Sequence, residues 1–262
     1  PAAWASLEGV YSMRGRRVAA VRLNPLRYNP PAGELHLATE LTVTIRTAAA
    51  PGKPGIQQAP ARPNRVFDDA VRSLVANPGL VPTANATTTD RPAADIDYLL
   101  ITDASLTNAF QALIDHRRGA AGGSYTAAMV TTADIYASYG GEDNQARIRN
   151  CIRDYVTTHN TSYVCLGGSS QDVPDRDCYV SCGSYTQNRM PTDLYYSDLD
   201  GSWDADGDGV YGEAGDDSAE MDLLPDVIVG RITVDTPQQA ADYTAKLIDY
   251  ETGFDAINAV IG

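Results

Sequence analysis

Histidine and positive charge are scarce in this sequence, and long apolar runs are absent from it. Only three histidines occur in 262 residues, so an imidazole base has to be His36, His116 or His159. The 34 acidic residues outnumber the 20 basic ones, giving a formal net charge of -14. This charge argues against a nucleic acid or an anionic membrane as the partner. Since no run of about eighteen apolar residues occurs, no transmembrane helix is predicted.

Catalytic and nucleotide-binding motifs are also missing. The sequence has no GxGxxG motif and no P-loop, so nucleotide binding has no support. His36 falls on the polar face of a predicted strand, whereas His116 and His159 fall at the ends of predicted helices, where structural roles are expected. Cys165 lies inside a predicted strand, where burial raises a thiol pKa. We therefore predict no catalytic residue in this chain.

The four cysteines are Cys151, Cys165, Cys178 and Cys182. An even number permits two disulfides in three pairings, and the alternative is that all four are small buried apolar residues. Cys178 and Cys182 flank three residues of a predicted loop, so we predict a local disulfide between them. No histidine is suitably spaced to complete a zinc site.

What the sequence does contain is a strongly patterned acidic loop. Asp204, Asp206 and Asp208 alternate with small residues, and a glycine follows. Calcium requires six to eight oxygen ligands, which alternating carboxylates of a tight loop can supply. The Val210 carbonyl and the Glu213 side chain are the further ligands that we predict.

This loop resembles the first half of an EF-hand and departs from its second half. Gly215 stands where the bidentate glutamate of an EF-hand would be. The sequence therefore predicts calcium on a non-helical scaffold, the alternative being a solvated acidic turn. Asp193, Asp198 and Asp200 lead into the loop, and we expect them to support its ligands rather than to form a glycosidase carboxylate pair.

Residues 1–47 have the pattern of β structure. Alternating apolar and polar residues from Leu35 to Ile45 predict a half-buried strand. Val18–Leu23 is the expected partner strand, and residues 29–33 are the turn between them. Two or three strands are not stable alone in water, so they must pack on another part of the protein.

A Pro- and Ala-rich linker, 48–94, contains one short helix that Asn64 is expected to cap. From Asp95 onward strands alternate with helices, which predicts parallel pairing with right-handed crossovers. The expected strands are 98–102, 126–130, 162–167 and 226–231, and the expected helices begin at Ser105, Glu142 and Thr236. The predicted α/β fold is an open doubly wound parallel sheet, which binds ligands beyond the carboxyl ends of its strands.

Several runs together resemble the gingipain-type cysteine peptidases. They are Pro191–Tyr196, Leu199–Asp204, the acidic loop to Glu213, Asp222–Arg231, Tyr98–Thr102, and the Leu166 and Asp172–Pro174 segments. In the N-terminal part, Gly15–Ala20, Tyr28–Pro30 and Gly33–Leu35 look like the end of that family's β-rich propeptide.

The resemblance implies a secreted, calcium-stabilised cysteine endopeptidase that is made as a zymogen. Residues 1–47 would be the C-terminal part of the propeptide, 48–94 a linker with a short helix, and 95–262 the first α/β subdomain of a caspase-like catalytic domain. The family's catalytic Cys and His belong to a second subdomain, and the His-Gly motif of that subdomain does not occur here.

We therefore expect a fragment of an extracellular peptidase that acts on polypeptides. Its catalytic half would lie downstream or on a second chain. The alternative is a non-catalytic extracellular structural or binding module that has kept a peptidase-derived fold.

Overall fold

A computed structural model describes residues 3–46, 63–81, 95–213, 215, 217, 221 and 223–261, and the side chains only as far as residue 253. Much of the predicted linker, residues 48–62 and 82–94, lies outside this description.

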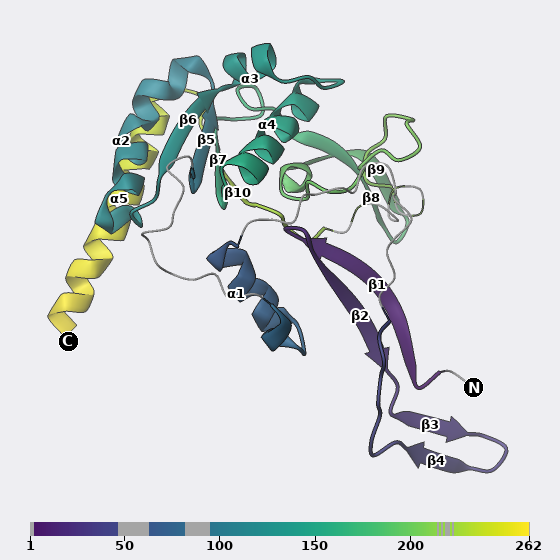
Figure 1. Ribbon diagram of the computed structural model, residues 1–262. Helices are drawn as coiled ribbons and strands as arrows, with labels where there is room; N and C mark the ends of the chain where they lie inside the picture. Colours follow the sequence, from purple (N-terminus) through teal and green to yellow (C-terminus); the bar gives the residue numbers. More distant parts are fainter. Residues whose placement is uncertain are drawn as a thin grey trace.

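A four-stranded parallel sheet forms the centre of the α/β part (Figure 1). Its strands are β5 (Tyr98–Thr102), β6 (Ala127–Thr131), β7 (Tyr163–Gly167) and β10 (Ile228–Ile232), in the order β10-β7-β5-β6. The central strand β5 is buried on both faces, and Leu99, Leu100 and Ile101 are inaccessible to solvent. This double burial explains why the strand is a continuous apolar run rather than an alternating one.

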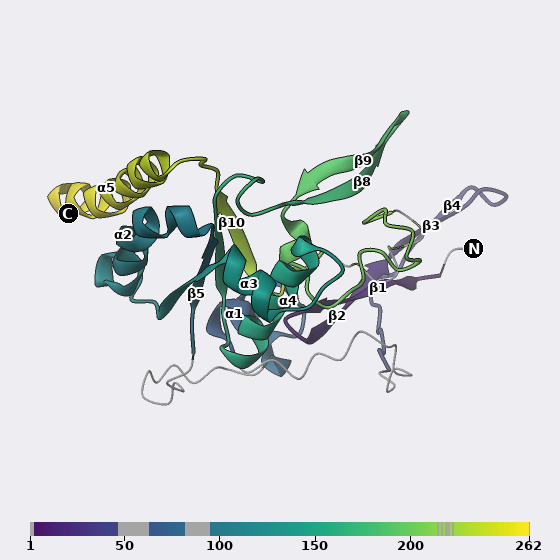
Figure 2. The ribbon, with the colours of Figure 1, turned by 90° about the horizontal axis from the view of Figure 1, so that it is seen from above.

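Helices cover both faces of the sheet (Figure 2). They are α2 (Thr107–Arg118) and α5 (Pro237–Ile261) on one face, and α3 (Thr132–Ser138) and α4 (Asn144–Thr158) on the other. Phe110 and Leu113 of α2 pack with Leu100, whereas Ile148 and Ile152 of α4 belong to the core on the opposite face. The predicted open doubly wound parallel sheet is confirmed. No helix in the described ranges is both long and apolar enough to cross a membrane.

Two details of this α/β part differ from the sequence prediction. Ser105 does not cap a helix: Ala104–Leu106 is a 3-10 turn whose cap is Asp103, and α2 begins only at Thr107. The short helix α3 was not predicted. Its cap is the side chain of Thr131, which accepts a hydrogen bond from the Asp134 amide at 3.1 Å.

The segment after β7 contains an antiparallel hairpin where only a loop was predicted. Its strands are β8 (Arg176–Cys182) and β9 (Tyr185–Thr192), and the hairpin projects away from the sheet (Figure 2). Most of β9 is exposed, so it lacks the alternating apolar positions that identify a strand in a sequence.

The N-terminal part forms two separate hairpins, made of β1 (Ala5–Met13), β2 (Arg16–Leu23), β3 (Leu26–Asn29) and β4 (Glu34–Leu37). The predicted turn at residues 29–33 does close the second hairpin, but Val18–Leu23 pairs with β1 and not with the segment from Leu35. The strand predicted to reach Ile45 ends at Leu37. Leu35 and Leu37 are 67% and 62% exposed, so the predicted burial of this strand was wrong for the described residues.

Helix α1 (Arg65–Leu74) lies between the first hairpin and the sheet (Figure 1). As predicted, Asn64 caps it and accepts hydrogen bonds from the Val66 and Phe67 amides. Phe67 packs with Met13 of the hairpin in a small core of its own. Among the described residues, the other 3-10 turns are Pro78–Leu80, Ala120–Gly122 and Leu194–Tyr196.

Candidate functional site

The acidic loop brings its three predicted aspartates together. Carboxylate oxygens of Asp204, Asp206 and Asp208 lie within 4.8 Å of one another. Gly207 and Gly209 have φ of +78° and +83°, a conformation that glycine adopts without strain. The carboxylates also accept hydrogen bonds from amides of their own loop, such as Val210 N to Asp208 Oδ1 at 2.7 Å. The two glycines thus allow the tight winding that brings the three carboxylates together.

Glu213 is not among the loop carboxylates that lie within 4.8 Å of one another, which are those of the three aspartates. Its backbone amide instead donates to Asp217 Oδ2 at 2.9 Å. The fully buried Asp217 also accepts from the Ala205 amide at 2.6 Å, so it ties the two ends of the loop together. Sequence reasoning missed Asp217 because both of its partners are backbone amides, which no side-chain pattern indicates.

A second acidic group lies where the sequence predicted only support for the first. Asp198, Asp200 and Asp226 are all buried, and their oxygens also lie within 4.8 Å of one another. Burial, together with repulsion from Asp200 and Asp198, raises the pKa of Asp226 to about 7. Asp200 is 7% exposed, and its Oδ2 atom has no hydrogen-bond partner among the described residues. A bound cation would offset this concentration of buried negative charge.

The segment between the two acidic groups is fixed to α4. The buried Arg149 donates to the carbonyl oxygens of Asp198 at 2.6 Å and of Gly201 at 2.9 Å. Burial lowers the pKa of Arg149, since desolvation disfavours its charge. Asp193 is not part of either acidic group, and its carboxylate pairs with Arg231 at 2.7 Å.

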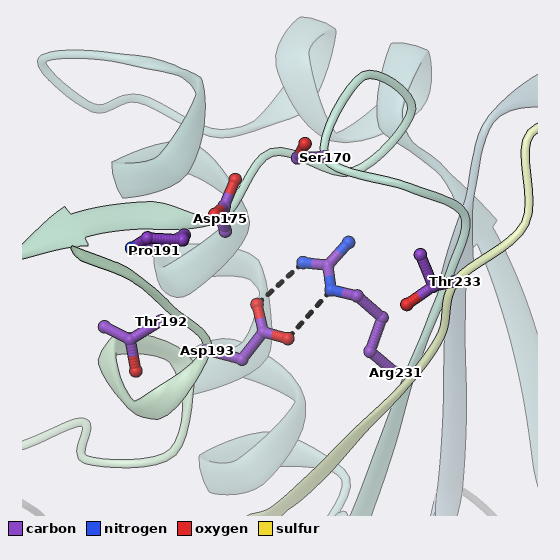
Figure 3. Close-up of a pocket in the computed structure, with 7 residues that line it drawn as sticks. All are labelled: Ser170, Asp175, Pro191, Thr192, Asp193, Arg231 and Thr233. Atoms are coloured by element: carbon purple, nitrogen blue, oxygen red, sulfur yellow. Dashed lines mark hydrogen bonds and ion pairs between the residues drawn. The ribbon is translucent and has the colours of Figure 1, made fainter. Parts of the chain in front are cut away.

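A pocket of about 250 Å³ opens at the carboxyl edge of the sheet, where β7 and β10 end (Figure 3). Its lining residues are Ser170, Asp175, Pro191, Thr192, Asp193, Arg231 and Thr233. The Arg231 guanidinium is bidentate to Asp193 and donates to the Val173 carbonyl at 2.7 Å. The lining set contains no cysteine or histidine.

The thiols and imidazoles do not form an activated pair. Burial raises the pKa of Cys151 and of Cys178 to about 12, and it also raises that of the buried Cys165. The exposed Cys182 is at the end of β8. The histidines are elsewhere: His36 is in the exposed strand β4, His116 of α2 contacts Glu251, and His159 caps the C-terminus of α4.

The structure does not bring Cys178 and Cys182 together, and both are free thiols. Three residues of β8 lie between them, and four steps along an extended strand place their Cα atoms about 13 Å apart. A disulfide requires Cα atoms closer than about 7 Å. The predicted bridge was based on a loop at 178–182, whereas this segment is part of β8.

The parallel sheet and its two helical layers define an open α/β protein. A family model described as peptidase family C25 matches residues 91–260, and the chain belongs to this family, the gingipain family. The search of curated proteins found no match.

Two solved structures resemble the chain. One, a structure of a protease, has a TM-score of 0.41 and 14% identity over 62% of this chain. The other is a complex of the pro- and mature domains of RgpB from Porphyromonas gingivalis, with a TM-score of 0.40 and 13% identity over 59% of this chain. The match covers 29% of the length of each.

Proposed function

We propose that this chain is a non-catalytic α/β unit of a secreted, calcium-stabilised cysteine endopeptidase that acts on polypeptides. The family match over residues 91–260 carries this proposal. The nucleophilic cysteine and its histidine base would come from another part of the protein. The burial and raised pKa of three of the four thiols favour this division, because catalysis requires a thiolate close to an imidazole.

The activity test uses the purified chain and fluorogenic peptides that end in arginine or lysine. We expect no turnover and no stoichiometric labelling by thiol-directed peptidyl inhibitors. A Cys182→Ser variant controls for simple alkylation of the exposed thiol. The proposal fails if an inhibitor labels one cysteine stoichiometrically and if replacing a single histidine abolishes that labelling.

Calcium is the cofactor that the two acidic groups support best. The Asp204, Asp206 and Asp208 carboxylates converge in a loop, and the Val210 carbonyl follows directly. Three close carboxylates repel one another unless a cation or protons neutralise them. The same reasoning applies to Asp198, Asp200 and Asp226, which are removed from solvent. Calcium at either group would stabilise the segment 198–217.

Thermal unfolding with calcium or with a chelator tests this cofactor. A ligand present at a hundred times its Kd stabilises by about 2.7 kcal/mol, which corresponds to a Tm increase of about 5 °C or more for a chain of this size. Asp206→Asn should reduce the increase if the loop binds calcium, and Asp200→Asn should reduce it if the buried group does. Asp115→Asn, on the exposed surface of α2, is the matched control. Identical melting curves with calcium and with chelator would sink the cofactor proposal.

A further inference from the structure

Arg14 forms the tip of the first hairpin and inserts into the α/β part of the protein. With Gly15 it makes the two-residue turn between β1 and β2, and both residues have positive φ, 51° and 73°. Such a turn matches the twist of the strands that it joins. Yet Arg14 is only 2% exposed, an unusual state for an arginine at a hairpin tip.

The guanidinium of Arg14 is bound by oxygen atoms of the α/β part. Its Nη1 atom donates to the carbonyl oxygens of Thr161 at 2.5 Å and Asp226 at 2.8 Å, and its Nη2 atom donates to Asn160 Oδ1 at 2.9 Å. The backbone amide of Arg14 donates to Asp226 Oδ1 at 2.5 Å. The Phe67 ring of α1 lies 4.9 Å from the guanidinium carbon. These oxygens suit the planar, forked arrangement of arginine donors, which lysine lacks.

All three residues whose oxygens accept these hydrogen bonds lie at the amino edge, which is the edge of the sheet where the strands begin. Asn160 and Thr161 lie three and two residues before the start of β7, and Asp226 lies two residues before the start of β10. Arg14 therefore connects the starting points of two neighbouring strands. The pocket with Arg231 is at the opposite, carboxyl edge. The hairpin thus occupies the edge that α/β sheets do not use for ligands.

The hairpin and the amino edge depend on each other. A two-stranded hairpin is at best marginally stable alone in water. Beside the Arg14 contacts, Arg16 forms an ion pair with Asp68 of α1, whose side chain is buried. Without the guanidinium, the buried carbonyl oxygens of Thr161 and Asp226 would lose a donor, which is costly.

We propose that the amino edge carries a guanidinium-binding site whose ligand is the arginine-tipped hairpin of residues 5–23. Through this site the hairpin acts as a clamp that holds the starts of β7 and β10 together. It leaves the carboxyl edge open. This role does not require peptidase activity, and it shares Asp226 with the buried acidic group proposed to bind calcium.

Native-state hydrogen exchange of the full chain, read by mass spectrometry, tests the clamp. The variants are Arg14→Ala, Arg14→Lys and Arg22→Lys. Arg22 is the matched control, because it lies in the same hairpin and its ion pair with Glu8 is on the surface. In both Arg14 variants we expect amides of 6–22, 161–164 and 226–229 to exchange about ten- to a hundredfold faster, the effect of losing buried hydrogen bonds. Exchange in α2 and in the Arg22→Lys chain should not change.

Each outcome decides the question. If Arg14→Ala does not fold, Arg14→Lys still tests the proposal, because lysine keeps the positive charge but lacks the planar guanidinium donors. Faster exchange confined to the hairpin and the amino edge supports the clamp. Unchanged exchange at these amides in Arg14→Lys overturns the guanidinium-binding site. Uniformly faster exchange that includes α2 overturns the local clamp, because Arg14 would then act on global stability alone.

Discussion

Arg176 is the residue at which β8, α4 and the acidic loop meet. Its guanidinium is bidentate to Asp143, the N-cap of α4, at 2.7 and 2.8 Å. The same group lies over the rings of Tyr211 at 3.9 Å and Tyr195 at 4.5 Å. Arginine is suited to this position because its flat cation can stack on rings while its edge pairs with a carboxylate.

Asp143→Asn tests the ion pair without removing the helix cap, since asparagine caps as well as aspartate. Burial opposes ionisation of Asp143, but the hydrogen bonds from Arg176 and from the Ala146 amide outweigh it and lower its pKa. A carboxyl whose pKa is lowered by folding stabilises the fold above its unfolded pKa of about 3.9, and this contribution is lost as the pH falls through the folded pKa.

Urea unfolding should therefore show a loss of about 2 kcal/mol for Asp143→Asn at pH 7. The difference from the wild-type chain should begin to shrink as the pH falls below about 3.9 and should disappear only below the lowered folded pKa of Asp143. Asp177→Asn, an exposed neighbour of Arg176 in β8, should have no such effect. A loss that stayed constant with pH would mean that the charge of Asp143 is not what stabilises the fold.

At the residue scale, the sequence predicted the groups of side chains whose members are close together in the chain. Asp204, Asp206 and Asp208 converge because two-residue spacing in a glycine-containing loop brings carboxylates together. Asp226 was assigned only to a strand, because its acidic neighbours Asp198 and Asp200 are more than twenty residues earlier in the chain. The hydrogen-bond partners of Arg14 are still more distant along the chain, and no periodic pattern in the sequence indicates them.

At the scale of elements, β8 determines the chemistry of two cysteines. Cys178 is buried against the core that includes Trp203, whereas Cys182 is exposed at the end of the strand. Reactivity towards alkylating agents depends on exposure and on thiolate content. The two thiols should therefore behave differently although only three residues separate them.

Alkylation of the native chain without reductant should modify Cys182 alone. After unfolding in denaturant, all four cysteines should be modified, as peptide mapping would detect. Cys182→Ser should abolish the native reaction. Failure to alkylate Cys178 and Cys182 even after unfolding would instead reveal the disulfide that the sequence predicted. The strand β8 could then not be continuous from Cys178 to Cys182.

Strong patterns predicted the elements of the sheet well. The strand 98–102 was predicted with its observed bounds, because β5 is a short apolar run with polar residues before and after it. The hairpin β8–β9 was missed, because its residues are largely polar and its strands are stabilised by pairing with each other. The predicted pairing of Val18–Leu23 failed for a different reason, since β1 is a nearer partner joined by the tight Arg14–Gly15 turn.

At the scale of the whole molecule, charge is unevenly balanced. The net charge of -14 causes repulsion that favours expansion of the chain. Six of the formal negative charges are concentrated in the two acidic groups. Opposing this, Arg16, Arg117, Arg176 and Arg231 form ion pairs with partly or fully buried partners. Added salt screens repulsion between exposed charges more than it screens buried pairs.

Sodium chloride should therefore stabilise this protein at pH 7. Raising it from about 10 mM to about 300 mM shortens the Debye length from about 30 Å to less than 8 Å, so repulsion across the surface is largely removed. In chelator, which prevents calcium from contributing, we expect the Tm to rise by a few degrees. At pH 5, near the pI of about 4.5, the net charge is small and the same salt should have little effect. A Tm that falls with salt at pH 7 would show that attraction within the ion pairs, rather than net repulsion, dominates the electrostatic free energy of this fold.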